Sequence, residues 1–202
     1  SLTLMGEDIE GNIIEGEAEI TASNRKFKKI YYKEEPKVLP EVLNAIQEAD
    51  LIIFSSGSLI TSIIPHLLDS KLNNAIKNSK AKTMYVCNLF TQPGETDDFK
   101  VSDHIKVLNK YLGKRKIDIV IANNGTIDKK LAMKYSNLEQ KDPVLLDVKE
   151  TKQENVKIIS ENLVKIDEID TSKFADEATY LVTCFRGGTA LNSYDLYWNP
   201  ET

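Results

Sequence analysis

The sequence predicts an α/β fold of the Rossmann-like type, a three-layer arrangement with a mainly parallel sheet and an antiparallel hairpin near the N-terminus. From Pro40 onward, short apolar segments alternate with helical segments of about ten residues, a pattern that implies parallel pairing through right-handed crossovers. Residues 2–5 and 12–20 instead flank a polar connection with glycines at both ends, which favours an antiparallel pair. The 202 residues suffice for one sizeable core. We place this domain at residues 1–185, followed by a tail at 186–202 without an assigned role.

The elements follow in order from their hydrophobic spacing. A helix is expected at residues 40–49, because Pro40 suits a first helical position and apolar residues recur at helical spacing. Apolar runs predict buried strands at 51–54, 83–87 and 117–121, and helices are expected at 58–68, continuing to 78, and at 103–112. Later candidates are a helix over 128–135, strands at 143–146, 156–159, 163–166 and 180–185, and a closing helix at 171–178.

Composition and charge narrow the function classes. The net charge of −5 argues against a general nucleic-acid footprint, and we interpret the basic run at residues 26–29 as a solvated strand edge. The apolar runs are too short to span a bilayer and no signal peptide opens the sequence, so we expect a cytoplasmic protein without a membrane span. Cys87 and Cys184 are the two cysteines, and we expect free buried thiols.

The first chemical candidate is the loop that follows strand 51–54. Gly57 and Ser58 lead into an expected helix that carries Thr61 and Ser62. Small residues let a backbone approach a ligand, and the start of a helix offers N–H groups to an anion. A phosphate would fit there, but a serine that only caps the helix explains the same pattern. The residues alone leave both interpretations open.

The second candidate is the loop at residues 88–98, which follows strand 83–87. In an open α/β sheet, ligands bind at this carboxyl end of the strands. Asn88, Thr91 and Gln92 lie close to the strand end, where we favour contact with a sugar or base edge. Glu95 and Asp97 offer carboxylates to Mg²⁺ beside a phosphate. A solvated acidic turn is the alternative, which we prefer for Asp97 and its neighbour.

The third candidate loop covers residues 122–126, where an Asn-Gly pair specifies a tight turn. Asn123 and Asn124 would share the sheet edge of the other two loops if the strands are parallel neighbours. His104 lies in the first turn of the expected helix, with Ser102 as its expected N-cap. It could donate to a phosphate or act as an acid or base, although such a histidine more often supports a site indirectly.

The residues of these loops resemble one known family. The segments at 57–68, 85–96 and 102–104 closely resemble the gluconeogenesis factor family, which is CofD-like and comprises bacterial relatives of the archaeal 2-phospho-L-lactate transferases. Its most specific part is the string Thr-Gln-Pro-Gly-Glu-Thr at 91–96 with Ser-Asp-His downstream. The resemblance implies a Rossmann-like cytoplasmic protein that binds uridine-diphosphate sugars. It also implies that a glycine-rich segment before Ser1 would complete the nucleotide site in a longer protein.

On these grounds the sequence nominates a set of site residues. Glu95 and His104 are the catalytic candidates, and Glu95 and Asp97 the metal candidates, with Mg²⁺ required only by a transferase. The ligand-binding candidates come from the three loops and the following helix: Gly57, Ser58, Leu59, Thr61, Ser62, Asn88, Thr91, Gln92, Gly94, Glu95, Thr96, Asp103, His104, Asn123 and Asn124.

Three function classes follow. We prefer a regulatory protein that binds a nucleotide or nucleotide sugar of the UDP-sugar type, of which UDP-N-acetylglucosamine is one example. The resemblance links it to cell shape and cell-wall precursor balance on gluconeogenic carbon. The alternative is a Mg²⁺-dependent transferase of a phospholactyl or phosphoryl-type group from a nucleotide-activated donor, and the third is a degenerate scaffold protein. No activated nucleophile pair stands out in the sequence. A homo-oligomer is compatible with the sequence, and a regulatory protein partner is expected but not identified.

Overall fold

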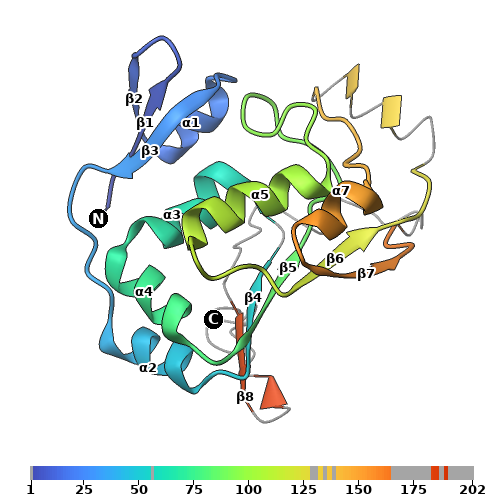
Figure 1. Cartoon of the computed structure of the whole chain (residues 1–202). Helices are drawn as coiled ribbons and strands as arrows, with labels where there is room; N and C mark the ends of the chain where they lie inside the picture. Colours follow the sequence, from blue (N-terminus) through green and yellow to red (C-terminus); the bar gives the residue numbers. More distant parts are fainter. Residues whose placement is uncertain are drawn as a thin grey trace, which may run out of the picture.

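The computed structural model describes residues 2–55, 57–127, 132–133, 136–137, 140–164, 183–186 and 189–190. These residues form two sheets: a three-stranded antiparallel sheet near the N-terminus and a six-stranded sheet of order β7-β6-β5-β4-β8-β9. Figure 1 shows the smaller sheet beside the helices that cover the larger one. The predicted α/β fold, with a mainly parallel sheet and antiparallel pairing near the N-terminus, is therefore confirmed. Within the described residues, no helix has both the length and the apolar character needed to cross a membrane.

The N-terminal sheet contains β1 (Leu4–Asp8), β2 (Ile13–Glu15) and β3 (Phe27–Tyr32), in the order β2-β1-β3. Asp8 fixes the β1–β2 turn, because its buried carboxylate accepts hydrogen bonds from Asn12 and Glu10 and pairs with Arg25 at 2.6 Å. The side-chain hydrogen bond from Asn12, with the contact from Arg25, holds the pKa of Asp8 well below its usual range against the opposing effect of burial. The basic run at 26–29 lies on β3, as expected.

One predicted strand is wrong. The sequence favoured extended backbone through residue 20, but Glu17–Ala22 forms the helix α1. Gly16 ends β2 with φ +105°, a conformation that L side chains rarely adopt. Acidic residues then occupy the first turn of α1, where they complement the helix dipole. Ile20 points into a small core with Leu4 and Ile30, so its burial fixes the helix on the sheet.

The larger sheet is parallel through β4 (Leu51–Phe54), β5 (Lys82–Val86), β6 (Ile119–Asn123) and β7 (Lys157–Glu161). These strands confirm the predicted segments at 51–54, 83–87, 117–121 and 156–159. On the other edge of β4, β8 (Thr183–Arg186) pairs antiparallel and is followed by β9 (Thr189–Ala190). The strand predicted at 180–185 is thus confirmed over residues 183–185.

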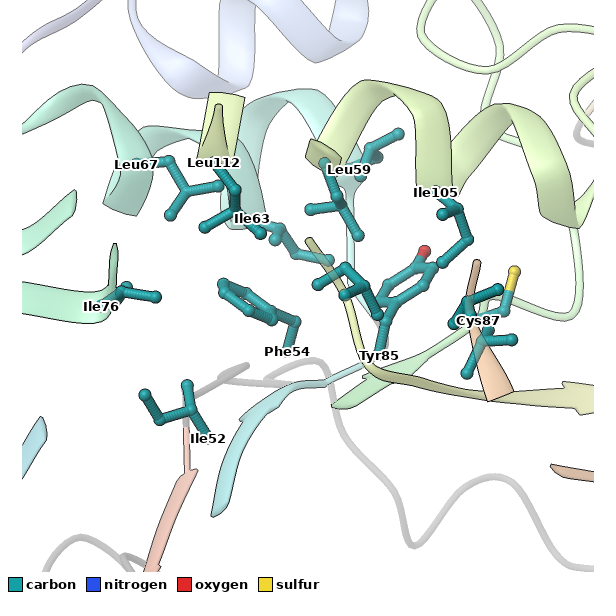
Figure 2. Close-up of a cluster of buried hydrophobic side chains, with 14 of the residues drawn as sticks. Ile52, Phe54, Leu59, Ile63, Leu67, Ile76, Tyr85, Cys87, Ile105 and Leu112 are labelled. Carbon is teal, nitrogen blue, oxygen red and sulfur yellow. The ribbon is translucent and has the colours of Figure 1, made fainter. Parts of the chain in front are cut away.

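Helices cover one face of this sheet. They are α2 (Pro40–Glu48), α3 (Ile64–Leu68), α4 (Ser70–Asn78), α5 (Val101–Leu112) and α7 (Val148–Gln153). On α5, Val101, Ile105, Leu108 and Leu112 recur every three or four residues and are fully buried. Figure 2 shows Phe54 and Tyr85 directed from the strands toward the helices, among the buried side chains of Leu59, Ile63, Ile105 and Leu112.

A wide helical turn joins β4 to α3. Residues Leu59–Ile63 form the π-helix η1, in which the N–H groups of Ser62 and Ile63 both donate to the carbonyl of Ser58. Pro65 follows at the start of α3, where its missing N–H and its ring bulk do not fit a continuous α-helix. Ile60 of this segment and Leu68 of α3 pack against both cores, and so join the N-terminal sheet to the larger one.

Some expected elements have a different structure, and others fall outside the described residues. Pro143 forms an isolated bridge with Phe90 instead of a strand, and α7 was not expected. Residues 162–164 are not extended into a strand. Most of the helix predicted over 128–135, the end of the strand at 163–166, the closing helix at 171–178 and most of the tail after 186 lie outside the described residues. So does the Cys184 side chain, whereas Cys87 is a free buried thiol as expected.

Candidate functional site

A cavity of about 630 Å³ lies at the carboxyl ends of β4 and β5. Its floor comes from the last residues of β5 and the loop that follows, and one wall comes from Gly57 and η1. The remaining walls come from α1 of the N-terminal unit and from Lys141 and Leu163. The parallel sheet therefore positions most of the site, and the antiparallel unit closes one side of it. This location is the one that the general rule for open α/β sheets predicts.

Seven of the nominated residues line the cavity: Gly57, Ser58, Thr61, Ser62, Asn88, Thr91 and Gln92. The side chain of Asn88 is committed to the backbone of Gly57, because its Nδ2 donates to the carbonyl at 2.7 Å and its Oδ1 accepts from the N–H at 3.2 Å. This reciprocal pair ties the loop after β4 to the loop after β5. Gln92 makes no side-chain hydrogen bond to another described residue, so its amide can serve a ligand.

Glu95 reaches the same wall from the neighbouring loop. One carboxylate oxygen accepts hydrogen bonds from the Ser58 hydroxyl and from the N–H of Ile60, at 3.1 Å in the second case. The other accepts from Thr61 at 3.0 Å and from Thr21 at 3.5 Å. The Ser58 and Thr61 hydroxyls also contact each other. The Ser58 hydroxyl also accepts from the N–H of Thr61 at 3.2 Å, so the serine cap that the sequence left open is present. An internal carboxylate occupies the position beside η1 that the other interpretation assigned to a phosphate.

The loop that carries Glu95 is held in a fixed shape. Gly94 has φ +77°, and a Cβ atom there would lie 2.5 Å from the backbone of Asn24. The buried hydroxyl of Thr96 accepts from the N–H of Gln92 at 2.8 Å, and the carboxylate of Asp97 accepts from the N–H of Gly94. These two nominated residues and Gly94 therefore shape the loop from within and do not line the cavity.

The structure does not bring the rest of the nominated set to the cavity. Leu59 is a fully buried core residue. Asp103 accepts from the N–H of Lys100 and so caps α5, which places the N-cap at Lys100 and not at Ser102. Ser102 instead donates to Asp147, which links α5 to α7.

The two asparagines after β6 serve their own turn. Asn123 bonds both backbone groups of Gly125 and accepts from the N–H of Leu163, so its side chain is fully engaged. Asn124 is exposed and donates to Ser160 at 3.3 Å. Neither residue is among those that line the cavity. The third loop therefore joins the ends of β6 and β7. Its link to the cavity is the hydrogen bond that Asn123 accepts from the N–H of Leu163, a residue that lines the cavity.

His104 is completely buried beneath the site. Its Nδ1–H donates to the carbonyl of Lys100 at 2.9 Å, and its ring packs edge-on against Phe99 and parallel to Tyr85. Burial lowers the pKa of His104, so the ring is neutral near pH 7. Its Nε2 has no hydrogen-bond partner among the described residues. The histidine supports the loop above α5 and does not present an acid or base to the cavity.

Several lining residues escaped the sequence reasoning. Glu17 and Thr21 come from α1, which was predicted as a strand, and Glu17 accepts from the Ser62 hydroxyl at 3.2 Å. Lys141 is the one cation among the described residues that line the cavity. It is placed there because Thr91 pairs with Asp142 through two hydrogen bonds. No periodic pattern marks such a residue, since its position depends on a bridge between distant loops.

Two further observations concern chemistry at the site. Cys87 lines the cavity floor, but burial raises the pKa of its thiol to about 12, so it remains a neutral, unreactive thiol. Within the described ranges, His, Cys, Asp and Glu side chains form no group of three or more that could hold a metal ion. Glu95 and Asp97 are instead engaged by hydroxyl and backbone donors.

The fold and the cavity define an α/β protein with a cavity of about 630 Å³ at the carboxyl ends of its parallel strands. Comparison with known proteins makes the assignment specific, since the family model described as "2-phospho-L-lactate transferase CofD" matches residues 1–164. The chain therefore belongs to the CofD family. The gluconeogenesis factor of Bacillus subtilis is 37% identical over 180 residues, which cover 87% of this chain and 56% of that protein. The putative gluconeogenesis factor of Clostridium acetobutylicum is 39% identical over 77% of this chain and 36% of its own length.

The solved structures agree. A member of the UPF0052 family from Bacillus halodurans has a TM-score of 0.77 and is 36% identical, with 82% of this chain and 53% of that one covered. The chain spans about half the length of the Bacillus subtilis relative and of this solved chain. The expected kinship with gluconeogenesis factors is thus confirmed, as is the Rossmann-like fold.

Proposed function

We propose that this chain is the ligand-binding part of a cytoplasmic regulatory protein of the gluconeogenesis factor type, which binds a UDP-sugar without turning it over. Through this ligand it would link cell shape and the balance of cell-wall precursors to growth on gluconeogenic carbon. The observation that carries the proposal is the cavity of about 630 Å³ at the carboxyl ends of β4 and β5. Its volume falls within the range of about 300–1,000 Å³ that is typical of small-molecule sites.

The lining of the cavity supports a polyhydroxylated ligand with an anionic part. Glu17 and Gln92 offer carboxylate and amide groups that can exchange hydrogen bonds with sugar hydroxyls. Lys141 supplies a positive charge for a diphosphate, and Leu89 and Phe90 provide apolar surface for a base. None of these interactions requires an activated nucleophile, which fits binding without turnover.

A Mg²⁺-dependent transferase is the second candidate function, supported by the description of the matching family. It would need an acid or base and metal ligands at the cavity. Of the three nominated for these roles, Glu95 is bonded to hydroxyl groups, Asp97 to a backbone N–H and His104 is buried below the cavity. We therefore rank binding above transfer. A scaffold protein without a ligand is the third candidate.

Calorimetric titration separates these functions. The chain is titrated with UDP-N-acetylglucosamine, UDP-glucose, GDP and GTP, each with and without Mg²⁺, and the ligand is recovered for analysis by chromatography. We expect a UDP-sugar to bind independently of Mg²⁺ and to be recovered intact. Preference for a guanosine nucleotide with Mg²⁺, or recovery of a cleaved ligand, would favour the transferase. Absence of binding by all four would contradict the proposal and leave the scaffold.

The cavity itself is tested by two substitutions. Gln92→Ala and Thr61→Ala each remove a polar group from the lining, so each should weaken UDP-sugar binding by about tenfold, the usual effect of one lost hydrogen bond to a ligand. Gln47→Ala, at an exposed position on α2, is the matched control and should bind like the parent chain. If Gln92→Ala and Thr61→Ala both fold and bind normally, the site assignment is wrong.

A further inference from the structure

The hydrogen-bond donors beside η1 are already in use. The Ser58 and Thr61 hydroxyls and the N–H of Ile60 all point to the carboxylate of Glu95. On the same side, the Ser62 hydroxyl donates to Glu17. Each hydroxyl has a single proton. The Ser58 and Thr61 protons are used within the protein, on Glu95 or on each other, and the Ser62 proton is used on Glu17, so the hydroxyl oxygens keep only lone pairs for any other partner. This wall of the cavity therefore accepts hydrogen bonds and does not donate them.

A phosphate and a sugar have opposite requirements at such a wall. A phosphate needs donors and a positive potential, whereas this wall offers hydroxyl oxygens and the Glu17 carboxylate, with the Glu95 carboxylate directly behind the Ser58 and Thr61 hydroxyls. Like charges at hydrogen-bonding distance repel each other strongly when they are shielded from water. A sugar hydroxyl or an acetamido N–H brings its own proton, which carboxylate and hydroxyl oxygens can accept. The wall beside η1 thus matches a hydrogen-bond donor on the ligand.

We infer that the wall formed by η1, Glu95 and α1 binds the sugar of the nucleotide sugar and not its phosphates, and that Glu95 determines this polarity. The inference rests on the proposed function and names which part of the ligand occupies which wall. It reverses the expectation from sequence, in which the small residues around Gly57 approach a phosphate.

Among the described residues, the positive charge that lines the cavity is on Lys141, which lies in a segment outside η1 and α1. Lys141 is held in the segment that pairs with the loop after β5, where Thr91 and Asp142 share two hydrogen bonds and Val144 donates to the carbonyl of Leu89. The diphosphate accordingly lies toward Lys141, and the sugar is directed toward Glu95.

Amide chemical shifts of the ¹⁵N-labelled chain locate the two parts of the ligand. The probes are inorganic phosphate, UDP and UDP-N-acetylglucosamine. Only the sugar-bearing probe is expected to shift the amides of Ile60, Thr61 and Ser62 in a saturable way, whereas all three probes should shift the amide of Asp142, next to Lys141. Saturable shifts of the η1 amides by phosphate or by UDP would overturn the inference while leaving nucleotide-sugar binding intact.

Substitution of Glu95 supplies the second measurement. Glu95→Gln keeps the size of the side chain but replaces one acceptor oxygen with an NH₂ donor, so the Ser58 or Thr61 hydroxyl loses its acceptor and can donate outward. The preference for UDP-N-acetylglucosamine over UDP should then fall about tenfold, the loss expected for one hydrogen bond to the ligand. The affinity for UDP itself should stay the same. Glu19→Gln, which removes an exposed charge of α1 that does not line the cavity, is the control and should change neither.

The outcomes are distinct. If Glu95→Gln leaves the preference for UDP-N-acetylglucosamine over UDP unchanged, Glu95 does not determine the polarity of this wall and the inference is overturned. If the parent chain binds neither UDP nor the UDP-sugar, the proposed function fails, and the inference falls with it. Loss of preference in Glu95→Gln with unchanged UDP affinity supports both.

Discussion

The neighbouring parallel strands β5 and β6 each have an asparagine at the carboxyl end, Asn88 just after β5 and Asn123 as the last residue of β6, but the two side chains bond to different parts of the fold. Asn88 crosses to the loop after β4 and holds both backbone groups of Gly57, which shapes a wall of the cavity. Asn123 turns back on its own chain and holds both backbone groups of Gly125. One asparagine joins two strand ends, and the other closes a single turn.

The difference shows that a place at the carboxyl edge of the sheet is necessary but not sufficient for a site. The loop after β5 faces α1 of the N-terminal unit, which adds Glu17 and Thr21 and encloses a volume. The turn after β6 lies next to β7, and its side chains bond there to Ser160 within β7 and to the N–H of Leu163 just after β7. A third element across from the loop is what creates the cavity.

The largest effect is expected at Gly94, which fixes the β5 loop against the N-terminal unit. Gly94→Ala places a Cβ atom 2.5 Å from the backbone of Asn24 at φ +77°. Backbone must shift, so the free energy of unfolding should fall by about 3 kcal/mol, and UDP-sugar binding should be lost. Denaturant unfolding and calorimetry provide the two measurements.

The matched control for Gly94 is Gly11→Ala. Gly11 also has positive φ, but a Cβ atom there meets nothing within 4 Å. This variant should lose only the conformational contribution, about 1 kcal/mol, and should keep its ligand affinity. Equal losses in both variants would show that the contact with Asn24 has no energetic role.

The comparison of the two asparagines can be tested directly. Asn88→Ala breaks two hydrogen bonds to the backbone of Gly57, and Asn123→Ala breaks two to Gly125 and one from the N–H of Leu163. The free energy of unfolding should fall by about 2 kcal/mol for Asn88→Ala and by about 3 kcal/mol for Asn123→Ala. Asn88→Ala should weaken UDP-sugar binding more than Asn123→Ala does, because Asn88 holds the loop at Gly57 whereas Asn123 is tied to the cavity only through the N–H of Leu163. If Asn123→Ala weakens binding to the same extent, the turn after β6 belongs to the site after all.

A pH effect of intermediate size is expected from His104 below the β5 loop. Burial lowers the pKa of His104 in the folded state, so the unfolded chain binds the proton more readily. The free energy of unfolding therefore keeps its full value above the unfolded pKa of about 6.5. It decreases as the pH falls below that value, because the unfolded chain then takes up a proton that the folded chain does not, with a slope of at most about 1.4 kcal/mol per pH unit.

Unfolding free energies measured at pH 7, 6 and 5 test this expectation. The parent chain should lose stability over this interval, and His104→Gln should lose less. An identical slope in both would assign the acid sensitivity to another group.

The smallest effect is expected at Asn124, the exposed neighbour of Asn123. Asn124→Ala removes a single 3.3 Å contact to Ser160. The free energy of unfolding should change by less than about 0.5 kcal/mol, and binding should be unchanged. A clear loss of affinity would return Asn124 to the candidate site.

Much of the sheet was predictable because its signals are local. The runs at 51–54 and 83–87 are apolar and bounded by polar turns, and the apolar spacing of α5 fixes its buried face. The helix α1 was missed because Gly16 redirects the chain within a segment of acceptable strand residues. The pattern of side chains there does not reveal the positive φ that ends the strand.

The site was only partly predictable, since its walls depend on contacts across the fold. The Thr-Gln-Pro-Gly-Glu-Thr string located the loop after β5, but only its first two residues, Thr91 and Gln92, line the cavity. The other nominated lining residues are Asn88 and four small residues between 57 and 62. The string did not reveal that Glu95 bonds to Ser58 and Thr61 or that Lys141 reaches the cavity through a bridge at Phe90. These partners lie far apart in sequence and meet only after folding.

The position of β4 between an early and a late partner has a consequence for synthesis of the chain. Ile52 pairs with Thr83 on one side and with Cys184 on the other. The described residues that line the cavity all precede Val164, so they leave the ribosome before β8 does. A nascent chain can therefore assemble its cavity while the outer edge of β4 still lacks β8. During that interval an unpaired strand edge is open to intermolecular pairing, and a ligand that binds early would shorten it.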